Sequence, residues 1–202
     1  PAGLAMRVVV ATGNAGKLRE LAALLEGLDL QLVAQTDLGV ASIEETGSTF
    51  AQNALLKARH AARCTGLAAI ADDSGLEVDA LGGAPGLYSA RYAGPMADDT
   101  ANNARLIQAL SGVPPEGRSA RYRCVLAFVR DAQDPVPLIA EGAWEGCIVD
   151  EPRGSGGFGY DPHFWLPDRQ RSAAELPAAE KNRISHRGIA MRCLREALER
   201  RA

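Results

Sequence analysis

Cysteine and histidine are scarce in this sequence, and neither residue is arranged in a common metal or redox motif. The four cysteines, at positions 64, 124, 147 and 193, form no C-x-x-C pair, which argues against a zinc site and against a disulfide framework at this chain length. The three histidines form no H-E-x-x-H arrangement, the pattern typical of zinc metalloproteases. We interpret the cysteines as buried thiols in a reducing cytoplasm.

Long apolar runs and a strong charge imbalance are also missing. No apolar stretch of the sequence approaches the roughly 18 residues of a membrane span, and its first residues lack the basic and apolar regions of a signal peptide. The formal net charge of -3 gives no reason to expect a nucleic-acid partner. We therefore expect a cytoplasmic protein that binds neither membranes nor nucleic acids. Met6 is one candidate for the native first residue, in which case residues 1–5 are a cloning remnant.

The chain has 202 residues, 47% of them hydrophobic, which suits a single domain covering residues 1–202. Its first part predicts a strand over 7–11, a helix that Asn14 could cap, and a second strand over 30–34. The helix has a stripe of leucines at positions 18, 21, 24 and 25. A strand–helix–strand unit favours a parallel pair with a crossover helix.

The later segments add further helices and strands. Thr49 and Gln52 fit a capping box, and we expect the helix that they begin to end near Cys64. The remaining segments are predicted as a strand over 67–71, a helix over 98–110, strands over 119–130 and 137–149 that could be antiparallel, and a last helix from about Ser185. The apolar face of the last helix is formed by Ile189, Cys193, Leu194, Ala197 and Leu198. Together these elements predict an α/β fold with a mixed central sheet flanked by helices, in two lobes.

Two pairs of adjacent carboxylates are candidates for chemistry. Asp72 and Asp73 follow the apolar run 67–71, so the end of a buried strand would deliver both to one point. Such a pair is unfavourable unless a cation or a proton lies between the carboxylates, and magnesium uses oxygen ligands of this kind. The alternative is a turn in which aspartate caps a bend. Glu44 and Glu45 are solvated loop charges unless folding brings them to the aspartates.

Residues 12–17, T-G-N-A-G-K, lie where the first strand turns into a helix. Backbone N–H groups at a helix N-terminus attract phosphate, and Lys17 adds a full positive charge. The segment is neither a Walker A loop nor a G-x-G-x-x-G motif, because key positions hold alanine and leucine. A capped helix start with a solvated lysine is the alternative.

A glycine-rich loop over 153–161 contains two aromatic residues, Phe158 and Tyr160. Glycine permits close approach of the backbone to a ligand, and an aromatic ring can stack on a base. The alternative is a tight hairpin with both rings in the core. Lys181 and the S-H-R segment at 185–187 lie at the entry to the last helix. His186 and Arg187 could donate to a carbonyl on a base edge, and ordinary solvation of a helix start is the alternative.

Six motifs follow one another in order along nearly the whole chain: T-G-N-A-G-K, E-E-T-G-S-T-F-A-Q-N-A, A-D-D-S-G-L, G-G-A-P-G, G-G-F-G-Y-D-P and S-H-R-G. With these motifs the sequence resembles the non-standard purine nucleoside triphosphate pyrophosphatases, a family that includes bacterial dITP/XTP pyrophosphatases and inosine triphosphatases. The resemblance implies two lobes around a nucleotide-binding cleft, a magnesium ion and a homodimer. The implied reaction cleaves the α–β phosphoanhydride of dITP, ITP or XTP to give the monophosphate and pyrophosphate, which cleanses the nucleotide pool.

The same resemblance implies roles for individual residues. Asp73 and Glu45 would hold magnesium, with Glu44 and Asp72 as weaker candidates, and Asp73 would also be the general base. The residues implied to bind the triphosphate are Thr12, Gly13, Asn14, Ala15, Gly16 and Lys17. The residues implied to complete the substrate site are Ser74, Phe158, Gly159, Tyr160, Asp161, Lys181, His186 and Arg187, with the ring of Phe158 stacked on the purine.

The residues also suggest how the base is selected, and two alternative functions stay open. Donors from His186 and Arg187 would suit the carbonyl oxygen of hypoxanthine or xanthine and would face the amino group of adenine unpaired. A pyrophosphatase for modified pyrimidine triphosphates is one alternative. A regulatory module that binds nucleotides without turnover is another, although such a module has no need for two acidic pairs.

Overall fold

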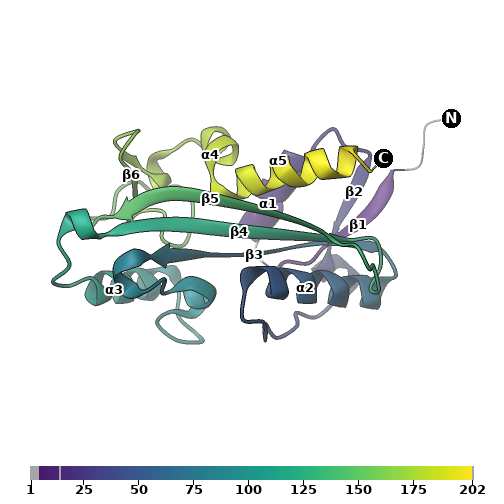
Figure 1. Cartoon of the computed structure of the whole chain (residues 1–202), viewed down its shortest axis with the longest axis horizontal. Coiled ribbons are helices and arrows are strands. Elements are labelled where there is room, and N and C mark those ends of the chain that lie inside the picture. Colours follow the sequence, from purple (N-terminus) through teal and green to yellow (C-terminus); the bar gives the residue numbers. More distant parts are fainter. Residues whose placement is uncertain (1–4, 14, 202) are drawn as a thin grey trace. The chain divides into compact units, whose positions relative to one another are not determined.

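The computed structural model describes residues 5–13 and 15–201. Strands of these residues form one mixed seven-stranded sheet in the order β2-β1-β3-β4-β5-β6-β7 (Figure 1). The strands are β1 (Met6–Val10), β2 (Leu30–Ala34), β3 (Ala68–Val78), β4 (Ser119–Val129), β5 (Leu138–Ile148), β6 (Phe164–Leu166) and β7 (Arg171–Ser172). The flanking α-helices are α1 (Ala15–Leu25), α2 (Phe50–Thr65), α3 (Asp99–Ala109), α4 (Ala178–Ile184) and α5 (His186–Glu199).

The sheet begins with parallel strands and ends with antiparallel ones. β1 pairs in parallel with β2 on one side and with β3 on the other. β6 pairs antiparallel with β5 and with β7. The mixed sheet and the parallel strand–helix–strand unit were both predicted and are confirmed, whereas α4 was not predicted.

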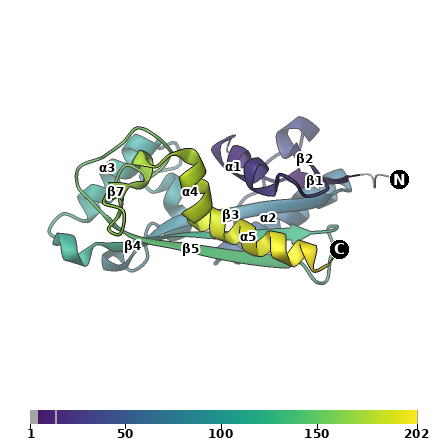
Figure 2. The same cartoon turned by 90° about the horizontal axis from the view of Figure 1, so that it is seen from above.

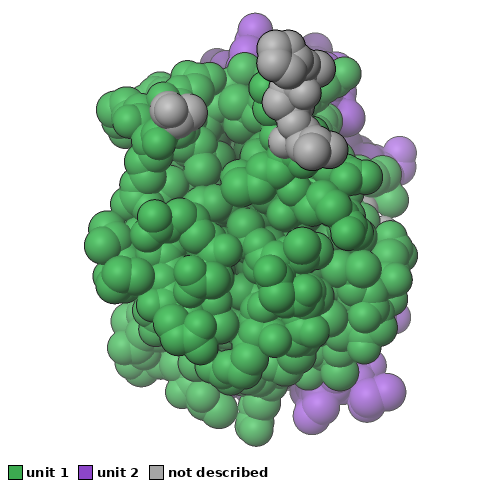
Figure 3. All heavy atoms as spheres, turned by 90° about the vertical axis from the view of Figure 1, so that its right-hand side faces the viewer, with its two compact units in different colours: residues 1–73, 124–141, 187–202 green, residues 74–123, 142–186 purple. Residues whose placement is uncertain are grey.

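The chain divides into two compact units, which Figure 3 colours separately. Unit 1 comprises the described residues of 1–73, 124–141 and 187–202, and unit 2 comprises residues 74–123 and 142–186. The boundaries between the units fall inside β3, β4 and β5, so each of these strands contributes residues to both. The nucleotide-binding cleft stays a prediction.

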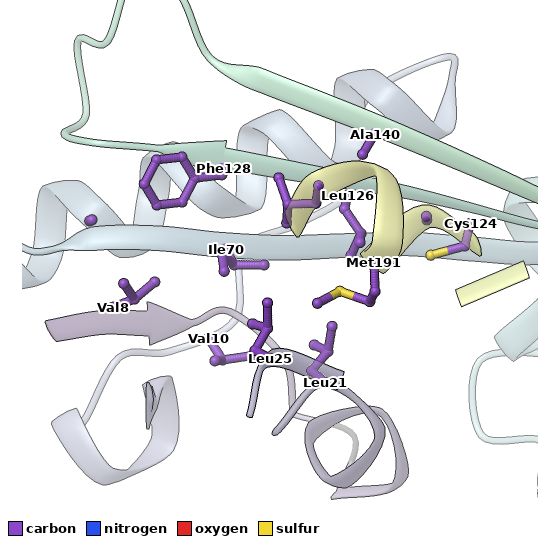
Figure 4. Close-up of a cluster of buried hydrophobic side chains, with 13 residues drawn as sticks. Val8, Val10, Leu21, Leu25, Ile70, Cys124, Leu126, Phe128, Ala140 and Met191 are labelled. Atoms are coloured by element: carbon purple, nitrogen blue, oxygen red, sulfur yellow. The ribbon is translucent and has the colours of Figure 1, made fainter. Parts of the chain in front are cut away.

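Unit 1 is held together by helices on both faces of its strands. α1 and α5 cover one face and α2 covers the other (Figures 1 and 2). Figure 4 shows Leu21 of α1 and Met191 of α5 within one cluster with Val10 and Ile70 of the strands. A fully buried leucine such as Leu21, which is 0% exposed, contributes about 1.5–3 kcal/mol to stability.

The face of α5 that packs on the sheet differs from the predicted one. Cys193 is exposed, while Ala190, Met191 and Leu194 are buried. Arg187 is buried on the same helix, at 1% exposure, because acidic side chains neutralise it. A search for an apolar stripe cannot include a charged residue, so the predicted face was displaced around the helix.

The cysteines do not share one environment. Cys124 is buried, and burial raises its pKa to about 12. Cys64 and Cys193 are exposed and Cys147 is partly exposed, so the interpretation of all four as buried thiols was wrong. The described helices are each too short or too polar to cross a bilayer.

The start of α2 is capped, with one difference from the predicted capping box. The Thr49 side chain accepts a hydrogen bond from the Gln52 N–H at 3.2 Å, as an N-cap does. The Gln52 side chain, however, accepts from the N–H of Ser48 at 2.8 Å, one residue before the cap. Gly66 ends the helix with a φ of 68°, a conformation that suits glycine.

Unit 2 has its own apolar core. Its fully buried members include Leu76, Leu106, Leu110, Ala120 and Phe164, each at 0% exposure. Aromatic rings of β4 and β6 pack among them, with 4.6 Å between the ring centroids of Tyr122 and Phe164. Unit 2 therefore supplies a rigid support for the glycine-rich loop that belongs to it.

Candidate active site

The two adjacent aspartates lie within β3, which continues beyond them to Val78. Successive side chains of a strand point to opposite faces of the sheet. Asp72 forms ion pairs with Lys17 of α1 and Arg187 of α5, whereas Asp73 forms an ion pair with Lys57 of α2. The prediction that a strand end delivers both carboxylates to one point was therefore wrong.

Asp72 belongs to a buried cluster of charges. Its carboxylate, 1% exposed, lies 2.9 Å from the Lys17 Nζ and 3.7 Å from a guanidinium nitrogen of Arg187. Arg187 also pairs with Glu20 of α1. Burial alone would raise the pKa of Asp72, but Lys17 and Arg187 outweigh it and hold that pKa well below its usual range. Asp72 is thus ionised and neutralised by protein cations, which leaves it a supporting role.

Asp73 has a different environment on the opposite face of the strand. The Lys57 Nζ lies 3.1 Å from its Oδ1 and 2.7 Å from the Oε1 of Glu45. Burial raises the pKa of Asp73 above its usual value; Lys57 opposes this rise and Glu45 adds to it. Asp73 is therefore a stronger proton acceptor than an ordinary aspartate.

Lys57 is a site residue that the sequence analysis missed. It lies on the buried side of α2, next to Ala58, which is 0% exposed. A lysine on an alanine-rich helix face is an available signal, because a buried ammonium group requires carboxylate partners. The sequence does not say which of the carboxylates these partners are.

The loop before α2 holds Glu45 over the helix. The N–H of Gly47 donates to the Asn53 Oδ1 at 2.8 Å. A Cβ at position 47 would lie 2.6 Å from that oxygen, so this close approach requires glycine. Glu44 is exposed, as a solvated loop charge, and only its neighbour Glu45 reaches Lys57.

A cavity of about 150 Å³ opens beside these charges in unit 1. It lies at the carboxyl end of β1, where the chain departs to β2 on one side and β3 pairs on the other. Open α/β sheets bind ligands at such a switch point. The lining residues are Ala11, Thr12, Gly13, Lys17, Gln35, Ser42, Ile43, Glu45, Lys57, His60 and Asp72.

Three residues of the predicted phosphate-binding segment line this cavity. Thr12, Gly13 and Lys17 line it, and α1 begins at Ala15 with Gly16 in its first turn. Asn14 lies outside the described residues. The helix start and the lysine therefore lie together, as binding of an anion requires.

The donors present fit a hard cation that takes only part of its ligands from protein. Glu45 and Asp73 offer carboxylate oxygens, and the Oδ2 of Asp73 is buried without a hydrogen-bond partner among the described residues. Within the same residues, no group of three or more His, Cys, Asp or Glu side chains is placed to hold a metal. Magnesium typically uses one or two carboxylates together with water and substrate phosphates, and two carboxylates are compatible with that ligand set.

Unit 2 contains a second cluster of predicted site residues, centred on Asp161. Its Oδ2 accepts from the Lys181 Nζ at 2.6 Å and from the Phe158 N–H at 2.9 Å. The Lys181 Nζ also lies 4.7 Å from the centroid of the Phe158 ring. Gly157 adopts a φ of 72°, and a Cβ there would collide with the Asp161 carboxylate. Asp161 thus holds both the loop backbone and the lysine.

The two aromatic residues of this loop have different positions. Tyr160 is 4% exposed and donates its hydroxyl hydrogen bond to the Ser89 carbonyl at 2.7 Å, so its ring belongs to the core. The Gly159 N–H donates to Asp99 at 2.6 Å, which anchors the loop to α3. Phe158 is half-buried. The core alternative therefore holds for Tyr160, and Phe158 keeps an accessible ring.

His186 and Arg187 are neighbours in sequence whose contacts lie in different units. The His186 ring stacks on Tyr122 with 4.7 Å between centroids and 11° between planes. Tyr122 was missed by the sequence analysis; burial and the nearby Asp161 raise its pKa well above the usual value. Arg187 forms ion pairs with Glu20 and Asp72 in unit 1.

Ser74, the residue after Asp73 in β3, is half-buried and belongs to unit 2. Each unit therefore holds part of the predicted set. Unit 1 holds the described part of the predicted phosphate-binding segment, the two predicted metal ligands and Arg187, while unit 2 holds Ser74, the loop with Phe158, Lys181 and His186.

Comparisons with known proteins identify the family of this chain. The model of the Ham1 family matches residues 8–197. Curated dITP/XTP pyrophosphatases of Shigella flexneri and Thioalkalivibrio sulfidiphilus are 60% and 58% identical to this chain, over 95% and 97% of it and 98% and 100% of their own lengths. The solved structure of a HAM1 protein from Coxiella burnetii is 50% identical with a TM-score of 0.90, covering 96% of this chain and 99% of that one. Since sequence and fold both match over nearly the full length, the chain belongs to the Ham1 family.

Proposed function

We propose that this protein hydrolyses non-standard purine nucleoside triphosphates, namely dITP, ITP and XTP, to the monophosphate and pyrophosphate. The observation that carries the proposal is the cavity of unit 1, where Lys17 and Lys57 lie among carboxylates at the carboxyl end of β1. The cations suit a triphosphate, and the carboxylates suit metal-assisted attack by water. Curated relatives named dITP/XTP pyrophosphatase support the same activity.

The reaction places its phosphate chemistry in unit 1. Lys17 and the start of α1 bind the triphosphate. A water molecule attacks the α-phosphorus, the bond from that phosphorus to the α–β bridging oxygen breaks, and pyrophosphate leaves. Asp73 orients the water and accepts its proton. Positioning and electrostatic stabilisation dominate catalysis in this class of reaction, which suits a site made mainly of fixed charges.

Glu45 and Asp73 would hold a magnesium ion, which when bound supplies neutralisation of the triphosphate charge. A cation lowers the pKa of a carboxylate that it touches, which weakens the carboxylate as a base. Burial raises the pKa of Asp73 and so acts in the opposite direction. Asp73 can therefore serve both as ligand and as proton acceptor.

The cluster of unit 2 is the proposed recognition element for the purine. Phe158 offers a half-buried ring for stacking, and Asp161 fixes the loop that carries it. Lys181 and His186 are the nearby donors assigned to the base. Arg187 acts instead as a positioning residue, because Asp72 and Glu20 hold its guanidinium.

The proposal also includes the cellular setting. We assign the enzyme to the cytoplasm as a homodimer that acts on free nucleotides, with no nucleic-acid or membrane partner. These assignments rest on the family resemblance and on the modest formal net charge of -3.

Pyrophosphate release is the direct test. A screen would compare dITP, ITP and XTP with dATP, dGTP, dTTP and modified pyrimidine triphosphates, each with and without magnesium. The proposal expects rapid, magnesium-dependent release from the first three only. Faster release from pyrimidine triphosphates would support the pyrimidine enzyme, and binding without any release would support the regulatory module.

Two neighbouring glutamates provide a matched pair of variants. Glu45→Gln removes the charge that pairs with Lys57, and we expect it to lower turnover by at least about tenfold, because one metal ligand loses its charge. Glu44→Gln makes the same chemical change at an exposed position and should leave turnover close to the wild-type value. Equal effects of the two variants would contradict the assignment of Glu45 to the metal.

A further inference from the structure

Lys57 lies between the two carboxylates that the proposed function assigns to magnesium. Its Nζ is 2.7 Å from the Glu45 Oε1 and 3.1 Å from the Asp73 Oδ1. One ammonium group therefore forms ion pairs with a loop residue and a strand residue at the same time. Its side chain is only 15% exposed, so water screens these contacts weakly.

The backbone that carries Lys57, Glu45 and Asp73 is well supported. Ala54, Ala58 and Ala61 are each 0% exposed, so α2 packs closely against the rest of unit 1. Glu45 is held by the loop that Gly47 anchors to Asn53, and Asp73 lies within a strand. Lysine, in contrast, has a flexible four-carbon stem that can move its charge without moving the backbone.

Two carboxylates this close need a positive charge between them, because like charges in a poorly screened site raise each other's free energy. Lys57 supplies that charge through oxygens that a metal ion would also use. An ammonium group and a magnesium ion cannot occupy the same position between Glu45 and Asp73.

We propose that Lys57 is a resident cation that holds Glu45 and Asp73 in place and releases them when magnesium binds, so that metal and ammonium compete for the same oxygens. The inference rests on the proposed function, since the two ligands are assigned there. The released ammonium group of Lys57 can then bind another anion. Lys57 lines the same cavity as Lys17, so a phosphate group bound there can accept its charge, and nucleotide then favours metal binding.

Metal binding without nucleotide tests the competition directly. Mn²⁺ serves as the probe, with free ion measured by electron paramagnetic resonance on wild type and on Lys57→Met. Loss of the competing ammonium should tighten Mn²⁺ binding by about tenfold or more. Asp73→Asn should weaken it, which locates the binding at this site.

Lys17→Met is the matched control. It removes one ammonium group from the same cavity, but Lys17 pairs with Asp72 rather than with the two ligands. Its gain in Mn²⁺ affinity should be only a few-fold, as expected for loss of a charge at longer range. Equal gains in Mn²⁺ affinity in the two variants would mean that loss of any positive charge explains the gain, which would overturn the proposal. An unchanged or weaker affinity in Lys57→Met would also overturn it.

A measurement on the wild-type protein covers the case in which Lys57→Met does not fold. Acetylation of lysine amines by acetic anhydride, read by mass spectrometry, should be faster at Lys57 after Mg²⁺ alone is added, because the released amine reaches solvent. An unchanged rate at Lys57 in an enzyme that releases pyrophosphate from dITP with Mg²⁺ overturns the competition and leaves the proposed function intact. If no triphosphate is cleaved, the proposed function fails, and the Mn²⁺ comparison alone decides the inference.

Discussion

Replacing Asp72 by asparagine should destabilise the protein strongly, although the two side chains have nearly the same shape. Asp72 and Arg187 are each 1% exposed, so the variant removes the charge of a carboxylate that pairs with a buried guanidinium, while the pair with Glu20 remains. Removing one partner of a buried ion pair typically lowers the free energy of unfolding by about 3–5 kcal/mol. Lys17 loses this ion pair too, but its side chain is 18% exposed and can turn towards water.

The pH dependence of that loss has a definite sign. The pKa of Asp72 is lower in the folded protein than in the unfolded chain, where it is about 3.9. Its charge therefore stabilises the fold above that pH, and the stabilisation disappears as pH falls through the folded pKa. The difference in stability between wild type and Asp72→Asn should be constant around neutral pH and should shrink below about pH 4.

Urea unfolding followed by circular dichroism measures this difference at several pH values. Asp79→Asn is the control, because Asp79 also pairs with an arginine, Arg121, but on the exposed surface. Its effect on the urea midpoint should be much smaller, since solvent screens such a pair. If Asp72→Asn unfolded at the same urea concentration as Asp79→Asn, or if its deficit did not change with pH, the account of the buried cluster would be refuted.

Four further variants address the rest of the molecule. Asp161→Asn should raise KM for dITP by roughly tenfold or more through the weakened hold on Lys181 and Phe158, since hydrogen bonds to charged groups contribute about 1.5–3 kcal/mol; steady-state kinetics would reject this with an unchanged KM. Phe158→Ala should also raise KM rather than lower kcat, because stacking on a base contributes about 1–3 kcal/mol. Calorimetric titration of Lys17→Ala should show a larger loss of affinity for a triphosphate than for a monophosphate, and equal losses would argue against its contact with the outer phosphates. Thr49→Ala should lower the free energy of unfolding by about 1 kcal/mol through loss of the helix cap, which a thermal melt checks.

Much of the fold follows from local patterns in the sequence. β2 has the predicted bounds, Leu30–Ala34. A short apolar run that follows an amphipathic helix is typical of a buried strand. β6 and β7 have only 3 and 2 residues, too few for an alternation of apolar and polar side chains to be recognised in the sequence. Position 193 shows the opposite difficulty, because a cysteine fits an apolar pattern whether or not its side chain is buried.

The site was predictable where one segment carries the chemistry and unpredictable where distant segments meet. Lys17 and Asp73 belong to short motifs. In the structure Lys17 lines the cavity, and Asp73 pairs with Lys57, another lining residue. Lys57 stands out on an alanine-rich helix face, but its carboxylate partners lie 12 and 16 residues away in sequence, and no local pattern identifies them. Arg187 was assigned to the base by its motif, yet its partners come from α1 and β3, and no local pattern reports such contacts.

The adjacent aspartates show how a strand separates two functions. Because Asp72 and Asp73 point to opposite faces, one meets protein cations that lower its pKa, while the other meets burial and a glutamate that raise it. Titratable groups whose environments drive their pKa values apart indicate different roles in acid–base chemistry. Asp72 remains an ionised partner of Lys17 and Arg187 at any working pH and stabilises the fold. Asp73, with a raised pKa and Lys57 as its partner, is the carboxylate to which we assign metal binding and proton transfer.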